Sequence, residues 1–545
     1  MLNNEVFDTN LMNKILRLCR ICCHGSEGMQ FYYSIFHRTI AICSIVLLTI
    51  LQHHSIALMH IAPFLDQKTK IICTMGPAIG SEEKIIELLH AGANAFRLNM
   101  SHGSHSVHKQ YVDFIRAAEK RIGFHIPIIA DLQGPKIRVS DLPNGSVPFM
   151  TGRDVYFADT AAFRSKKIKL PDDTIPIEYP TFAKDVKKGD FLLFDDGLLK
   201  AEVRATDGIV VKAVVINGGT LKSRKGLNLP STSVSQPALS DKDKKDVLFA
   251  IENGCDYVAL SFVRNAKDVQ LLQRFLAHHG SSMWICSKIE KPEAVTDLDN
   301  IVKASNAIMV ARGDLGVEIP AAQVPTVQKR IIALCNTYGK PVITATQMLE
   351  SMIQNPRPTR AEASDVANAV YDGTDGVMLS AETSVGAYPI DTVAYMRMIC
   401  SEAERALLRD DARLRRHVQG LPQKEQNTDL IAAAAASIAE DERIHAIATL
   451  SLSGETALLI SNKRPIAPII AVTELPNIAR RVGLFWGTTG VLMDNVTTTD
   501  DTIEELKKML VKKHYLHSGM QIVVTIGRPL VARSRTNMLS IEKLP

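Results

Sequence analysis

The chain has 545 residues, of which 46% are hydrophobic and 22% charged, and its 63 basic and 58 acidic residues leave a net charge of +5. This composition is typical of a globular protein, and the length exceeds that of one compact core, so three or four domains are expected. Because basic and acidic residues are nearly balanced and spread along the chain, no nucleic-acid partner is expected.

Residues 1–66 differ from the rest of the chain. Residues 39–51 read TIAICSIVLLTIL, thirteen residues without a charge. This run is short for a bilayer span, but it has the length of a signal segment or a buried segment. Two interpretations stay open: residues 1–58 are an upstream extension from a wrongly chosen start codon before Met59, or they include a real targeting or anchoring segment. Membrane contact is expected only if the 39–62 segment is real.

Four of the nine cysteines lie in this N-terminal extension, and the other five are scattered without paired spacing. Such a pattern indicates reduced, mostly buried thiols. We therefore expect a cytoplasmic protein.

From Lys68 onward, short apolar runs alternate with helical patterns. Near-continuous apolar runs indicate parallel strands buried on both faces, and segments such as EEKIIELLHAG show the spacing of helices. The eight runs are residues 70–76, 95–101, 126–132, 257–263, 284–290, 307–313, 341–347 and 376–382. Eight such units predict an α/β protein built on a (β/α)8 TIM barrel.

The third unit is interrupted by about 125 residues, far more than a connecting loop needs. Strand-like runs with Asp-Gly and Asn-Gly turns predict an inserted small β-barrel cap domain, which would close over the barrel mouth. After a charged stretch, alternating helix and strand patterns predict a C-terminal α/β domain. The predicted parts are the extension 1–66, the barrel 67–135 and 229–408, the cap 136–228 and the C-terminal domain 409–545.

Seven of the eight strands end in polar residues. They are Arg97, Asn99, Ser101, Asp131, Ser261, Lys288, Glu290, Asp314, Thr346, Ser380 and Glu382. One such residue alone would be an ordinary loop or cap residue. Because barrel enzymes build their active sites at the C-terminal ends of the strands, seven such ends predict an active site there.

Lys288, Glu290 and Asp314 suggest a type of chemistry. Two carboxylates from adjacent strands, with no His or Cys near, suit a hard divalent cation such as Mg2+. Lys288 precedes Glu290 by two residues and so points to the same face of its strand. A metal ion and an ammonium group together suit phosphoryl transfer. The alternative is a structural salt bridge between Lys288 and Glu290.

Four further residues could bind phosphate groups. Arg97 and Arg138 offer planar guanidinium groups for phosphate oxygens. Gly313 allows backbone N–H groups to approach an anion closely. Lys225, in the segment that returns from the cap, is expected to reach into the cleft between cap and barrel.

The motifs KIICTMGPA, FRLNMSHG, ADLQGPKIR, LSFVR, SKIEKPEAV, MVARGDLGVEIP, TATQMLESM and LSAETSVGAYP resemble those of the pyruvate kinase family, in the family's order. The resemblance covers residues 67–545. It implies phosphoryl transfer from phosphoenolpyruvate to ADP, giving ATP and pyruvate in the last step of glycolysis. It also implies a homotetramer.

The resemblance also implies a role for each matching residue. Glu290 and Asp314 would bind Mg2+, with Mn2+ as an alternative, and Lys288 would stabilise the phosphoryl group in flight. The implied substrate-binding residues are Arg97, Lys288, Gly313, Asp314 and Thr346. The implied nucleotide-binding residues are Arg97, Asn99, His102, Arg138 and Lys225. Thr346, Ser380 and Glu382 would serve the protonation of enolpyruvate.

One position departs from many family members. Those members bind K+ with oxygens at the positions of Asn99, Ser101, Asp131 and Leu132, and they have Glu where this chain has Lys136. A lysine ammonium supplies the same charge, and like charges repel strongly at short range. The sequence therefore resembles the potassium-independent branch, in which Lys136 fills the monovalent-cation position and K+ is not required.

Control by sugar phosphates is expected to be weak or altered. In the loop SLSGETA (451–457), Glu455 stands where family members activated by sugar phosphates often have a basic residue. Nearby arginines could compensate from a neighbouring loop. They are Arg528, Arg533 and Arg535.

Two rival interpretations stay open. A lyase or aldolase that handles phosphoenolpyruvate or oxaloacetate would share the metal-binding pair, but it would need neither an ADP site nor an inserted cap. A non-catalytic, membrane-tethered relative is disfavoured because every motif position needed for the chemistry is intact.

Overall fold

The computed structural model describes residues 65, 67–165, 167–230, 232, 234–409, 426–494, 498–529 and 534–545. The predictions for residues 1–64, which include the 39–62 segment, and for Arg533 lie outside the described residues. None of the helices that the structure describes is both long and apolar enough to cross a membrane.

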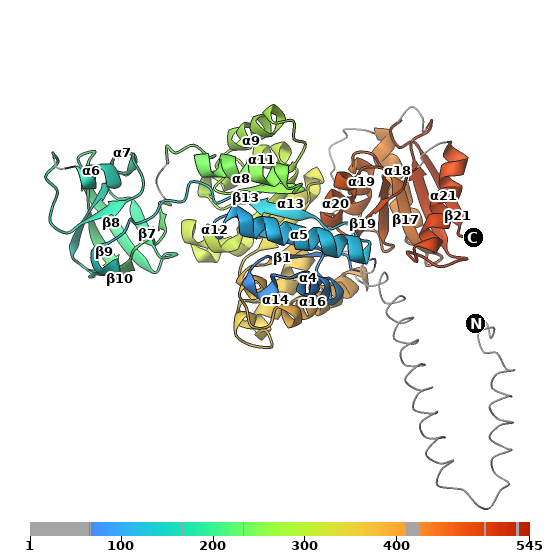
Figure 1. The fold of residues 1–545 in the computed structure, drawn as a ribbon, viewed down its shortest axis with the longest axis horizontal. Helices are drawn as coiled ribbons and strands as arrows, with labels where there is room; N and C mark the ends of the chain where they lie inside the picture. The colour runs from blue at the N-terminus through green and yellow to red at the C-terminus, as the bar shows by residue number, and fades with distance from the viewer. Residues whose placement is uncertain are drawn as a thin grey trace, which may run out of the picture. The chain divides into compact units, whose positions relative to one another are not determined.

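A closed barrel of eight parallel strands forms the centre of the described chain (Figure 1). The strands follow one another around it in the order β1-β16-β15-β14-β13-β12-β3-β2. Their bounds are β1 Lys70–Thr74, β2 Ala95–Asn99, β3 Ile128–Asp131, β12 Tyr257–Leu260, β13 Trp284–Ile289, β14 Ala307–Ala311, β15 Val342–Ala345 and β16 Gly376–Leu379. All eight predicted strands are present, so the (β/α)8 barrel is confirmed.

The strands are apolar on both faces because each face packs into its own core. Inside the barrel, side chains such as Ile72, Ile129 and Met309 form one buried cluster. Outside it, strand residues pack against the surrounding helices in a larger cluster. The helices are α4 Glu82–Ala91, α5 His105–Ile122, α8 Asp241–Glu252, α9 Ala266–His278, α10 Pro292–Thr296, α11 Leu298–Ala304, α12 Arg312–Glu318, α13 Val324–Tyr338, α14 Arg360–Asp372, α15 Ala381–Ser384 and α16 Pro389–Arg409.

Local sequence signals fix the ends of several barrel helices. Ser240 and Thr359 are the N-cap residues of α8 and α14, and each forms a full capping box. The N-cap side chain accepts the backbone N–H of the third helical residue, and the side chain of that residue accepts the backbone N–H of the N-cap. Gly123 and Gly339 end α5 and α13 in the left-handed conformation that glycine adopts without strain.

The chain between β3 and α8 forms the inserted cap around its own apolar core. Its strands make a six-stranded sheet in the order β11-β7-β8-β9-β5-β6 and a two-stranded sheet of β10 and β4. Their bounds are β4 Ser146–Phe149, β5 Asp154–Asp159, β6 Thr174–Ile177, β7 Phe191–Phe194, β8 Leu199–Thr206, β9 Val210–Asn217, β10 Gly219–Lys222 and β11 Leu227–Asn228, with two short helices α6 Thr160–Arg164 and α7 Phe182–Asp185. Strand β11 leads the chain back to the barrel.

The C-terminal domain contains a five-stranded sheet in the order β19-β18-β17-β20-β21, antiparallel only between β20 and β21. Its elements are α18 Gln426–Ile438, β17 Ile444–Leu450, α19 Glu455–Asn462, β18 Ile469–Thr473, α20 Pro476–Arg481, β19 Thr488–Leu492, α21 Thr499–Lys512, β20 Gln521–Ile526 and β21 Met538–Lys543. The predicted C-terminal α/β domain is therefore confirmed.

Candidate functional site

Five polar side chains from four neighbouring strands meet at the C-terminal end of the barrel. Arg97 of β2 donates from Nε to Asp131 Oδ2 of β3 at 2.6 Å. Lys288 of β13 donates from Nζ to Ser261 Oγ, directly after β12, at 2.8 Å. The same ammonium lies 2.8 Å from Glu290 Oε1 and 3.3 Å from Asp131 Oδ1. The predicted strand-end cluster therefore exists, with opposite charges in direct contact.

Burial makes these charges strongly interdependent, because Asp131 and Glu290 are each only 1% exposed. Burial alone would lower the pKa of Lys288, but the carboxylates of Asp131, Glu290 and Asp314 outweigh it and raise that pKa. Burial alone would raise the pKa of Asp131, but Lys288 and Arg97 outweigh it and lower that pKa. The site thus places an ammonium group whose pKa is raised beside a carboxylate whose pKa is lowered.

Glu290 and Asp314 are placed as a candidate metal pair. Burial raises the pKa of Glu290, and the nearby Asp314 charge adds to the rise while Lys288 opposes it. Glu290 Oε2 accepts the N–H of Phe262 at 2.7 Å, and the buried Oε1 lies 2.8 Å from the Lys288 ammonium. The described part of the chain has no group of three or more His, Cys, Asp or Glu side chains suited to a metal. A cation such as Mg2+, which keeps water and substrate oxygens among its ligands, fits a two-carboxylate set.

Helix α12 carries Gly313 and Asp314 in its first turn and contacts the turn after β15. Gly313 N donates to Thr346 Oγ1 at 2.7 Å, and a Cβ at Gly313 would lie 3.3 Å from that oxygen. Thr346 and Gln347 have φ values of 68° and 54°, a left-handed conformation that is strained for non-glycine residues. A direct hydrogen bond therefore joins the two predicted substrate-binding residues Gly313 and Thr346.

Ser380 and Glu382, at the end of β16, also contact each other. Glu382 is 2% exposed; its Oε2 accepts the Ser380 N–H at 2.7 Å and its Oε1 accepts the Leu349 N–H at 3.3 Å. Burial, as the main cause, raises the pKa of Glu382. Thr74 of β1 accepts a hydrogen bond from Arg97 Nη1 at 3.1 Å and donates to the carbonyl at the end of β16, which connects this region to the charged cluster.

The predicted nucleotide-binding residues fall into two groups. Arg97, Asn99 and His102 lie at or just after the end of β2. Arg138 and Lys225 lie where the chain enters and leaves the cap, and Lys225 Nζ pairs with Asp195 of the cap at 2.6 Å. Among the described residues, no hydrogen bond or ion pair joins the two groups.

The residues predicted to surround a monovalent cation are Asn99, Ser101, Asp131 and Leu132. Lys136 lies instead beside Gly226, where a Cβ would approach Lys136 Cε to 3.1 Å. The Lys136 ammonium makes no hydrogen bond or ion pair with any residue that the structure describes. Its filling of the cation position therefore stays a prediction.

Comparison with known proteins shows the family. The pyruvate kinase barrel-domain model matches residues 66–393, and the pyruvate kinase alpha/beta-domain model matches residues 429–542. The chain belongs to the pyruvate kinase family. It is therefore a phosphotransferase, and the rival interpretation as a lyase or aldolase is not supported.

Individual pyruvate kinases are similar over most of their length. The enzyme of Geobacillus stearothermophilus is 42% identical over 482 residues, which cover 88% of this chain and 80% of the relative. Pyruvate kinase 2 of Synechocystis sp. is 40% identical, with 88% and 79% covered. A crystal structure of a pyruvate kinase from Cryptosporidium parvum superposes with a TM-score of 0.81 at 35% identity, covering 89% of this chain and 97% of that one.

Arg312, in the pyruvate kinase motif MVARGDLGVEIP, is a site residue that the sequence reasoning missed. Its guanidinium donates to the carbonyls of Thr346 at 2.7 Å and Gln347 at 3.1 Å, and it pairs with Asp365 at 2.6 Å. The motif predicted only Gly313 and Asp314 as site residues. The position of an arginine directly after a barrel strand was the available signal.

The loop 451–457, for which weak or altered sugar-phosphate control is expected, includes the start of α19. Glu455 is the first residue of that helix. Ser451 Oγ accepts the Gly454 N–H at 3.0 Å, and the Thr456 and Thr536 hydroxyl oxygens lie 2.7 Å apart. Weak or altered sugar-phosphate control remains a prediction.

Proposed function

We propose that the chain transfers the phosphoryl group of phosphoenolpyruvate to ADP, giving ATP and pyruvate in the last step of glycolysis. The observation that carries this proposal is the buried cluster of Arg97, Asp131, Lys288 and Glu290 at the C-terminal end of the barrel. Phosphoryl transfer spreads charge over three oxygens, and preorganised cations stabilise that charge without reorganisation.

Lys288 and Arg97 are the proposed cations at the phosphoryl group. Asp131 bonds to Arg97 and lies 3.3 Å from Lys288, so both cations are held in fixed positions before substrate binds. The raised pKa of Lys288 favours its protonated form. Lys288 therefore acts as a fixed positive charge for the phosphoryl group in flight and not as a general base.

Glu290 and Asp314 are the residues proposed to hold Mg2+, or Mn2+ in its place. When bound, the ion would supply positive charge that helps to neutralise substrate oxygens. The burial of Glu290 beside the Lys288 ammonium, with Asp314 close enough to raise the pKa of Glu290, supports this assignment.

Gly313 and Thr346 are proposed to bind the substrate, and Thr346, Ser380 and Glu382 to serve protonation of enolpyruvate. The raised pKa of Glu382 favours its protonated form, which suits a member of a proton relay. Glu382 is buried and bonded to backbone N–H groups, so the proton would reach the substrate through intermediate groups.

ADP is proposed to contact Arg97, Asn99, His102, Arg138 and Lys225. Because Lys225 is paired with Asp195, we expect nucleotide binding to exchange that cap partner for a phosphate.

Lys136 is proposed to replace K+ beside the active site. The absence of any ion pair or hydrogen bond at its ammonium among the described residues leaves it available for this role. Lys136 lies beside Gly226, where the chain leaves the cap.

A homotetramer and a cytoplasmic location are proposed from the family resemblance and the cysteines. The five described cysteines are free and buried, as expected in a reducing compartment.

A lactate-dehydrogenase-coupled assay with phosphoenolpyruvate, ADP and Mg2+, run without and with KCl, tests the proposal. Similar rates of NADH loss in both buffers are expected. Loss only with KCl would keep the kinase and reject the role of Lys136. No loss in either buffer would reject the kinase.

A further inference from the structure

The segments that carry the two proposed metal ligands are joined by a buried ion pair. Lys291 directly follows Glu290, and Glu318 lies four residues after Asp314 on helix α12. Lys291 Nζ is 2.7 Å from Glu318 Oε1, and the Glu318 side chain is fully buried. This contact therefore connects the end of β13 to α12.

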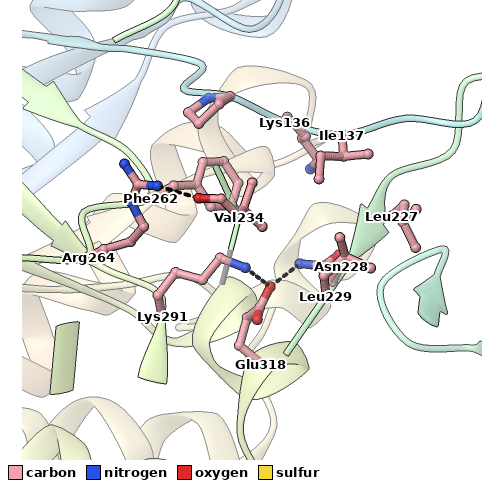
Figure 2. Close-up of a pocket in the computed structure, with 11 residues that line it drawn as sticks. Lys136, Ile137, Leu227, Asn228, Leu229, Val234, Phe262, Arg264, Lys291 and Glu318 are labelled. Atoms are coloured by element: carbon pink, nitrogen blue, oxygen red, sulfur yellow. Dashed lines mark hydrogen bonds and ion pairs between the residues drawn. The ribbon is translucent and has the colours of Figure 1, made fainter. Parts of the chain in front are cut away.

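A third residue ties this pair to the cap. Asn228 Nδ2 donates to the same Glu318 oxygen at 2.8 Å. Figure 2 shows Lys291 and Asn228 pointing at that oxygen from opposite sides. Asn228 ends β11, which pairs with β7 of the cap sheet. Glu318, on the helix that carries the proposed metal ligand Asp314, therefore also holds the strand that returns from the cap.

Helix α12 needs such contacts because its own sequence gives it little stability. It has seven residues, two of which are glycines, and its N-cap residue provides no side-chain hydrogen bond. Helices this short are not stable without tertiary contacts. The position of Asp314 is therefore set by what holds the helix ends, and Glu318 is the last residue of the helix.

We infer that Lys291 and Glu318 form a brace that fixes the spacing of the Glu290 and Asp314 carboxylates, and that Asn228 connects this brace to the cap. The inference rests on the proposed function of Glu290 and Asp314 as metal ligands. Lys291 and Glu318 are positioning residues, since they act through these neighbours and not on the metal. An ordinary buried salt bridge would support folding but would not tune metal affinity.

Mn2+ binding, measured by electron paramagnetic resonance without substrates, tests the brace. Lys291→Met and Glu318→Gln are expected to raise the Mn2+ dissociation constant about 10- to 100-fold, the usual effect of removing a residue that orients a ligand. Lys291→Arg keeps the ion pair and should retain affinity within about threefold. The matched controls are Lys84→Met and Glu87→Gln, which remove an exposed ion pair of the same type on α4.

Loss of folding is a separate effect, because removing one partner of a buried ion pair destabilises a protein strongly. The double variant Lys291→Met with Glu318→Met replaces both charges by apolar groups, which commonly keeps stability. This variant should fold, as judged by its melting temperature, but its Mn2+ affinity should remain below that of the wild type. Wild-type Mn2+ affinity in this folded variant would overturn the brace.

The connection to the cap has its own variant. Asn228→Leu leaves the ion pair in place, so Mn2+ affinity without nucleotide should stay at the wild-type value while the KM for ADP rises. An unchanged KM for ADP would overturn this part of the inference. If the wild-type chain binds no Mn2+, the proposed metal site fails; wild-type affinity in the brace variants rejects the brace alone.

Discussion

Replacing Arg312 tests whether the turn after β15 must be held in its strained conformation. Thr346 and Gln347 both have positive φ, at a cost of about 1–3 kcal/mol each. The Arg312 side chain, only 10% exposed, donates to the carbonyls of both residues. Hydrogen bonds from a charged group contribute about 1.5–3 kcal/mol each, so two of them offset the strain. In Arg312→Met the turn should relax and move Thr346 away from Gly313.

We expect kcat to fall on the order of 100-fold, because a shift of about 1 Å in a catalytic group has that effect. The KM for phosphoenolpyruvate should rise as well, because Thr346 and Gly313 are both proposed to bind the substrate. The coupled assay gives both constants. Arg443→Met, which removes an exposed arginine paired with Asp441, is the matched control and should leave both constants unchanged.

A second substitution separates strain from charge. Gln347→Gly adopts positive φ without strain, so adding it to Arg312→Met should restore part of the lost kcat and raise the melting temperature. If Arg312→Met keeps kcat within threefold of the wild type, Arg312 does not position Thr346 and the reasoning is wrong.

Three further outcomes are expected. Lys288→Met should lower kcat by about 100- to 1,000-fold and reduce the melting temperature, because it removes the charge proposed to stabilise the phosphoryl group and leaves Asp131 and Glu290 buried without their ammonium partner; wild-type kcat would reject the proposed role. Lys136→Ala should lose activity in potassium-free buffer and regain it with KCl; no effect of KCl would reject the substitution of K+ by Lys136. Burial lowers the pKa of Lys70 to about 7 from 10.5, so between pH 7 and 10.5 only the unfolded chain binds this proton and stability rises with pH. The shift corresponds to about 4–5 kcal/mol, and Lys70→Met should remove this rise in urea unfolding titrations; an unchanged pH profile would contradict it.

The barrel could be predicted because its signals are local. Each strand is a short run of residues that are apolar on both faces of the strand. Helix ends such as Gly339 are marked locally by a glycine in the left-handed conformation. The strand-end polar residues followed from the barrel itself, since parallel strands all end on one side. The cluster of Arg97, Asp131, Lys288 and Glu290 is therefore close to what the sequence predicts.

The supporting contacts could not be predicted because they join residues far apart in the chain. Asn228 and Glu318 are 90 positions apart, and Arg312 and Asp365 are 53 apart. Neither pair has a periodic pattern. The pairing of Lys225 with Asp195 could not be predicted either, because it depends on the geometry of a turn in the cap.

Helix α12 is held at both ends by such distant contacts. Arg312 holds its first turn to the turn after β15, and Glu318 holds its last residue to Lys291 and Asn228. Between these two ends lies Asp314, whose charge acts on both Lys288 and Glu290. Because a seven-residue helix cannot fix its own position, a change at either end should reach the proposed metal site, whereas changes in the long, capped barrel helices should be absorbed locally.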